Sequence, residues 1–210
     1  MFCGYDHADL FLYFWQTTVG TYTDSEHPLS AEWRVPLTKQ YVIDHAADYL
    51  TDKVHIANVG IGDNAVVEPR GQLPGGALYS QHQSLYQVDQ LRQQSLEQYD
   101  LVIRTRLDLA LTEPIDLQDL KSQLESNPRL VFTGANCVHY WYQYGMCDHI
   151  AISSPHNMSI YTNLIEHLPI YLNHIGFHSE GLLNFHLMRH DLIVKEIIPN
   201  SNDVLRDNSL

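Results

Sequence analysis

The segment Tyr99-Asp-Leu-Val-Ile-Arg-Thr-Arg-Leu-Asp-Leu, residues 99–109, decides how the chain is interpreted. Leu101–Ile103 are apolar at consecutive positions, a pattern typical of a strand buried on both faces, so we expect the central strand of a sheet here. Arg104, Arg106 and Asp108 follow at alternate positions, and alternate side chains of an extended chain lie on one face. Because unpaired charges are costly to bury, this triplet predicts the end at which the strand leaves the core.

The triplet allows two interpretations. Open α/β sheets bind ligands at the carboxyl ends of their strands, where two guanidinium groups and a carboxylate suit a diphosphate and a divalent cation. A cluster of internal arginine–aspartate ion pairs that ends the strand explains the same residues. The triplet by itself does not separate a ligand site from such a cluster.

Strand and helix patterns alternate around this segment. We expect further strands at 9–15, 53–57, 129–133, 148–153 and 192–198, and helices at 37–50, 77–98, 155–168 and 179–190. Loops are expected at 21–34 and 60–76, which are rich in polar residues or glycine. Strands separated by helices predict an α/β fold, a three-layer sandwich with a mostly parallel central sheet, formed as one domain by residues 1–210.

Composition excludes several classes of protein. The 210 residues are 44% hydrophobic, enough for a core, and 12 basic against 25 acidic residues argue against nucleic-acid binding. The longest strongly apolar stretch, Leu10–Trp15, is too short to cross a bilayer, and no signal-peptide pattern follows Met1. Cys3, Cys137 and Cys147 form no paired framework, so we expect a reducing, cytoplasmic setting, with Cys137 and Cys147 buried as small apolar thiols.

Residues 99–109 resemble a group of GT-A-type glycosyltransferases of capsule and lipopolysaccharide biosynthesis, found in bacteria and viruses. These enzymes carry R-x-R-x-D after a strand, where other relatives carry D-x-D. The likeness is one of patterns and covers roughly residues 75–198. It includes SQHQSLYQVDQLRQQ at 80–94, DHIAISS at 148–154, MSIY at 158–161 and HSEGLL at 178–183.

The resemblance implies a GT-A fold and transfer of a sugar from a nucleotide-diphosphate donor to a glycan hydroxyl, assisted by Mn²⁺ or Mg²⁺. It places Asp108 where the family has its metal- or nucleotide-contacting acid, with Arg104 and Arg106 flanking the donor diphosphate. Only eight residues precede the strand expected at 9–15. We therefore expect either that this strand binds the nucleotide or that the fold lacks the first βα unit.

Two further carboxylates are candidates for the acceptor side. Glu180 lies in the first turn of a predicted helix, where it could take a proton from the acceptor hydroxyl or simply complement the helix dipole. Asp148 opens a predicted strand and could activate or orient the acceptor. The alternative to an enzyme is a degenerate GT-A-like domain that binds sugar or a partner chain without catalysis.

Two of the 13 histidines, His186 and His190, have the i, i+4 spacing of a zinc-binding pair on one helical face. No nearby cysteine completes a ligand set, and chance clustering is easy among so many histidines. We therefore favour packing at a helix–sheet boundary over a metal site for this pair.

Overall fold

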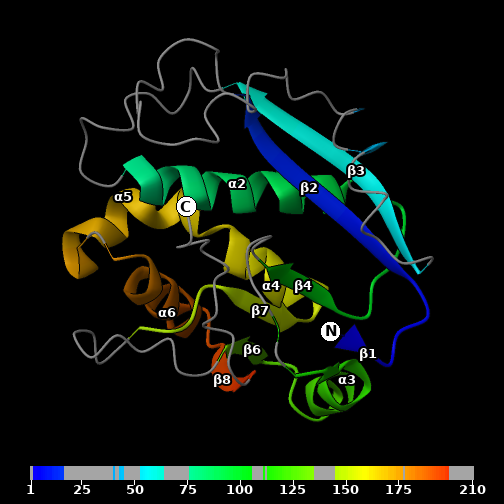
Figure 1. Cartoon of the computed structure of the whole chain (residues 1–210). Helices are drawn as coiled ribbons and strands as arrows, with labels where there is room; N and C mark the ends of the chain where they lie inside the picture. The colour runs from blue at the N-terminus through cyan, green and yellow to red at the C-terminus, as the bar shows by residue number, and fades with distance from the viewer. Residues whose placement is uncertain are drawn as a thin grey trace, which may run out of the picture. The chain divides into compact units, whose positions relative to one another are not determined.

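The computed structural model describes residues 2–16, 40, 43–44, 53–63, 76–105, 111, 113–134, 145–176 and 178–198 (Figure 1). The chain divides into two compact units, one of Met1–Tyr5 with Leu96–Leu210 and the other of Asp6–Ser95. Both units combine strands with helices, which confirms the mixed α/β class. Among the described residues, no helix has the length and apolar character needed to cross a membrane.

The unit Asp6–Ser95 is built on two parallel strands, β2 (Ala8–Gln16) and β3 (Val54–Asp63), against which α2 (Gly76–Gln93) packs. The strand predicted at 9–15 is confirmed. The strand predicted at 53–57 continues to Asp63, so the first residues of the expected loop 60–76 are strand instead. Gly60 allows this extension because it lies opposite Tyr13, whose ring occupies the space a side chain would need.

Gly60→Ala is expected to lower the free energy of unfolding by about 1–3 kcal/mol through overpacking. An added Cβ would lie 2.5 Å from Tyr13 Cδ2 and 2.9 Å from Leu91 Cδ1. Urea unfolding measures the loss, and the same substitution in a Tyr13→Leu background should cost less because the ring is gone. An equal loss in both backgrounds would show that the Tyr13 contact is not its cause.

The larger unit contains a four-stranded sheet in the order β4-β7-β6-β8 (Figure 1). Its strands are β4 (Val102–Thr105), β7 (Ile150–Ser153), β6 (Leu130–Gly134) and β8 (Ile193–Ile198). β7 runs antiparallel to both its neighbours, and only β6 and β8 are parallel, so the prediction of a mostly parallel sheet is wrong here. Residues 135–149 carry no helical pattern, and antiparallel neighbours need no crossover helix.

Among the described strands, β4 lies at an edge of this sheet, which corrects the expectation of a central strand. Leu101 and Ile103 pack against the core on one side and are only half-buried. A short apolar run is compatible with an edge strand covered by a helix as well as with a central strand, so its composition could not separate the two.

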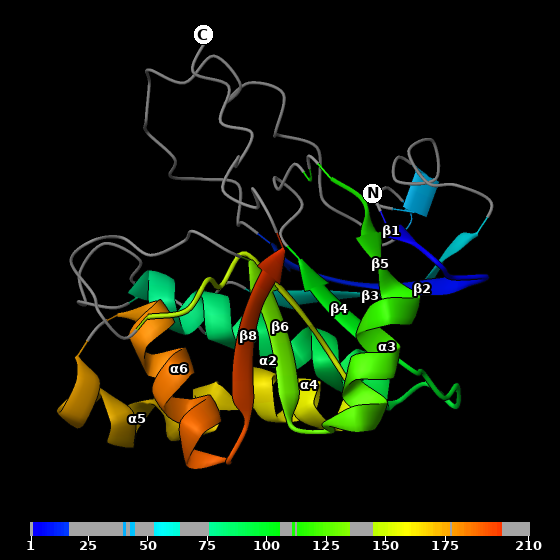
Figure 2. The ribbon, with the colours of Figure 1, turned by 90° about the horizontal axis from the view of Figure 1, so that it is seen from below.

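Helices cover both faces of the four-stranded sheet (Figure 2). On one face lies α3 (Leu117–Ser126), which follows β5 (Ile115–Asp116), itself paired with β1 (Phe2–Cys3). Asp116 caps α3 by accepting hydrogen bonds from the backbone N–H groups of Gln118 and Asp119. The buried cluster on this face consists of Ile115, Leu117, Leu120, Leu124, Leu130, Phe132, Ile150 and Ile152. The sequence interpretation missed α3.

The opposite face carries α4 (Pro155–Thr162) over β6 and β7 and α6 (Ser179–Arg189) over β8. α5 (Leu164–Ile175) packs against both of these helices. The single helix predicted at 155–168 is thus two helices, which meet at Asn163. The helix predicted at 179–190 is confirmed as α6, and its N-cap is His178.

Most of the other predicted elements are confirmed with shifted ends. The strands predicted at 129–133, 148–153 and 192–198 correspond to β6, β7 and β8, while α2 ends at Gln93, before the expected residue 98. Within the helix predicted at 37–50, residues 40, 43 and 44 are helical and the others lie outside the described residues. The loop expected at 21–34 lies outside them too.

Candidate functional site

Three of the five residues predicted to form the site lie within the described part of the chain: Arg104, Asp148 and Glu180. Arg106 and Asp108 lie outside it, so the convergence of the complete R-x-R-x-D triplet stays a prediction. All three described residues belong to the larger unit, at or near the ends of β4, β7 and α6.

Arg104 faces the side of the sheet that α4 covers. Strand register places it beside Ala151 of β7, which in turn lies beside Thr133 of β6. These three residues alternate with Ile103, Ile152 and Phe132, which point toward α3. Thr105, the last residue of β4, is exposed, so Arg104 lies where the strand leaves the core, as predicted.

Two buried N–H donors of Arg104 have no acceptor in the part of the chain that the structure describes. These donors are its Nε and Nη1 atoms. The hydroxyl groups of Tyr161 and Thr133 are also buried and also have no hydrogen-bond partner among the described residues. Because native proteins pair nearly all buried polar groups, this concentration of unsatisfied atoms on one sheet face indicates a place for water or a polar ligand.

The antiparallel direction of β7 brings Asp148 to this end of the sheet. Ile150, the first residue of β7, pairs with Thr105 at the end of β4, and Asp148 precedes it by two residues. The carboxylate is buried and accepts a hydrogen bond of 3.2 Å from Ser179 Oγ. His149 Nε2 lies 3.9 Å from the other carboxylate oxygen.

The amino end of α6 lies against the segment that contains Asp148. The backbone N–H of Met146 donates to the carbonyl of Glu180, and a Cβ built on Gly145 would lie 3.2 Å from Glu180 Cβ. His178 Nδ1 accepts a hydrogen bond from the N–H of Gly181 at 3.0 Å and lies 3.4 Å from Glu180 Oε2.

The charges of Arg104 and Asp148 both act on the hydroxyl of Tyr161 in α4. Burial raises the pKa of its phenol to about 12, while Arg104 lowers that pKa and Asp148 raises it. Both charges are therefore close enough to act on the same hydroxyl. Sequence reasoning included Tyr161 in the resemblance but gave it no role, because a tyrosine in a helix is most often a packing residue.

The described donor set suits an anion better than a divalent cation. These groups are the guanidinium of Arg104, the hydroxyl of Tyr161 and the carboxylate of Asp148. The Asp148 carboxylate already accepts a hydrogen bond from Ser179. Mg²⁺ and Mn²⁺ prefer several oxygen ligands, and a guanidinium group nearby opposes them. Asp108, the predicted metal ligand, lies outside the described residues, so we derive no step that depends on a cation.

Cys147 does not match its expected state. It is buried as predicted but is disulfide-bonded, which corrects the expectation of a free thiol. The spacing of the three cysteines could not predict the disulfide, because an odd number of cysteines is compatible with one disulfide bond. The cysteine pattern therefore no longer supports a reducing setting.

No protein-family model, no curated protein and no solved structure matches this chain. Function is therefore inferred from the residues themselves.

Proposed function

We propose that the protein is a glycosyltransferase that moves a sugar from a nucleotide-diphosphate donor to a glycan hydroxyl. One observation carries the proposal: buried N–H groups of Arg104, which have no partner among the described residues, lie at the end of β4 to which β7 brings Asp148. The resemblance of residues 99–109 to R-x-R-x-D glycosyltransferases supports the same assignment. A cytoplasmic setting belongs to the proposal only through the cysteine count, and a disulfide at Cys147 is not typical of that compartment.

The oxygens of a diphosphate could accept hydrogen bonds from the buried N–H groups of Arg104, which have no acceptor among the described residues. An unsatisfied buried donor costs about 1–3 kcal/mol, whereas a guanidinium group bonded to phosphate oxygens forms two strong, charge-assisted hydrogen bonds. The positive end of the α6 dipole, next to Asp148, adds a field that favours an anion. In the transfer step, Arg104 would stabilise the negative charge that grows on the leaving diphosphate.

The two carboxylates would then have different roles. Asp148 is buried and held by Ser179, so it is suited to orient a hydroxyl or the donor. Glu180 is only partly buried, so a bound acceptor could reach its carboxylate, which is suited to take a proton. Arg106, Asp108 and Mn²⁺ or Mg²⁺ belong to the proposal only through the resemblance.

Binding without catalysis is the second candidate. The position of Glu180 in the first turn of α6 favours it, because a carboxylate there stabilises the helix whether or not it reacts. The two candidates predict the same donor binding and differ in turnover.

Arg104→Gln is expected to weaken binding of UDP or inorganic pyrophosphate about 10–100-fold, since charge-assisted hydrogen bonds contribute about 1.5–3 kcal/mol. Isothermal titration calorimetry with and without Mn²⁺ measures this. Arg129→Gln is the matched control, because Arg129 pairs with Asp191 on the exposed surface. Equal affinities of the wild type and Arg104→Gln would mean that Arg104 is only a structural residue.

A further inference from the structure

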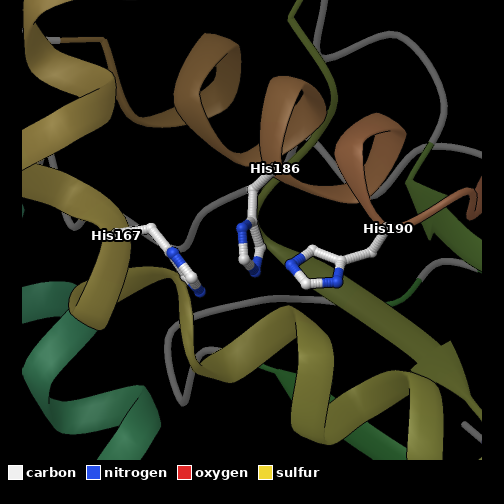
Figure 3. A group of neighbouring side chains, drawn as sticks. All are labelled: His167, His186 and His190. Atoms are coloured by element: carbon white, nitrogen blue, oxygen red, sulfur yellow. The ribbon is translucent and has the colours of Figure 1, made fainter.

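Three histidine rings from two helices converge in the larger unit (Figure 3). His167 lies on α5, His186 on α6, and His190 is the C-cap of α6. Ring centroids are 5.1 Å apart for His167 and His186, 4.6 Å for His186 and His190, and 5.8 Å for His167 and His190. One ring nitrogen of each lies within 4.8 Å of the other two.

The spacing of these nitrogens is close to that of a metal site. Ligand nitrogens around tetrahedral Zn²⁺, with bonds of about 2.0–2.1 Å, lie about 3.3–3.4 Å apart. The rings must therefore close by about 1.5 Å at most. His190 is exposed and His167 is half-buried, so both can rotate, whereas His186 is fully buried and supplies a fixed ligand.

Both ring nitrogens of the buried His186 have polar neighbours. Its Nε2 lies 2.8 Å from the carbonyl oxygen of Ile160 and 2.9 Å from Asn163 Oδ1, and its Nδ1 lies 3.3 Å from the Tyr171 hydroxyl. A carbonyl only accepts, so Nε2 carries the proton when no metal is bound. If a cation takes Nε2, the proton moves to Nδ1, where the Tyr171 oxygen can accept it. Metal-bound histidines in proteins commonly make such a bond through their second nitrogen.

We propose that His167, His186 and His190 form a site for a transition-metal cation such as Zn²⁺, with His186 binding through Nε2. The Ile160 carbonyl oxygen and Asn163 Oδ1 are the oxygen atoms beside His186 Nε2, and His190 is exposed, so water can reach the cluster. The site is distinct from the residues around Arg104, and the proposal does not depend on the glycosyltransferase function.

The test uses the full-length, untagged protein after removal of metals with EDTA. Titration calorimetry with Zn²⁺ is expected to show one strong site per chain, and Co²⁺ should produce visible absorption bands of a nitrogen-ligated ion. His167→Ala and His190→Ala should each weaken Zn²⁺ binding at least about 10–100-fold and remove the Co²⁺ bands. His174→Ala, an exposed histidine of α5 outside the cluster, is the matched control and should change neither.

The variants chosen avoid the buried His186, whose loss could prevent folding. Circular dichroism checks that each variant is folded, and Zn²⁺ should raise the melting temperature of the wild type but not of a His167→Ala, His190→Ala double variant. Unchanged Zn²⁺ affinity in the folded double variant, or an equal loss in His174→Ala, would overturn the proposal.

Discussion

Glu180→Gln is expected to lower the rate of sugar transfer by about two to four orders of magnitude, because glutamine cannot take a proton from the acceptor hydroxyl. Donor affinity and melting temperature should change little. The carboxylate is partly exposed, and its loss removes a helix-dipole interaction of only about 0.3–1 kcal/mol. Release of nucleoside diphosphate from the donor, with and without an acceptor glycan, measures the rate.

Glu166→Gln provides the matched control. Glu166 also lies in the first turn of a helix, α5, so its replacement changes the same dipole interaction away from the α6 terminus. If both substitutions affect transfer equally, Glu180 is a helix-end charge and not a base. If neither protein nor variant transfers sugar while Arg104 still determines UDP affinity, the chain is the non-catalytic binder of the second candidate.

From pH 10 to above pH 12, ionisation of Tyr161 is expected to lower the free energy of unfolding by about 3 kcal/mol in total. The unfolded tyrosine has a pKa of 10.0, whereas burial raises the folded pKa to about 12. Above pH 10 the unfolded state loses the phenol proton first, so stability declines as the pH rises. One pKa unit corresponds to about 1.36 kcal/mol, and the loss is complete only above the folded pKa.

Tyr161→Phe isolates this effect from the other groups that titrate in alkali. Urea unfolding between pH 8 and pH 11.5 should show a shallower decline in the variant. Tyr79→Phe, at a half-exposed position, should keep the wild-type slope. Near pH 7, Tyr161→Phe should cost little or stabilise by about 1 kcal/mol, because it removes a buried hydroxyl that has no described partner. Parallel curves for wild type and Tyr161→Phe would contradict the burial of the phenol.

The chain's local patterns predicted most of the described elements. The apolar run at 9–15 predicted β2, and Pro155 predicted the start of α4, because these signals depend only on neighbouring residues. The pattern also placed Arg104 correctly at the end of a strand, since a charge after three apolar residues marks the point at which a strand leaves the core. α3 was missed although Asp116 is an ordinary N-cap.

Strand direction and helix contacts were decided only by the tertiary structure. The residues of β7 do not encode which way it pairs, yet its antiparallel direction is what brings Asp148 to the end of β4 that carries Arg104. In the same way, the sequence shows His186 and His190 one helical turn apart, but only the packing of α5 against α6 adds His167. Local propensity depends on adjacent residues, whereas both groupings depend on contacts between segments far apart in the chain, which the sequence pattern does not specify.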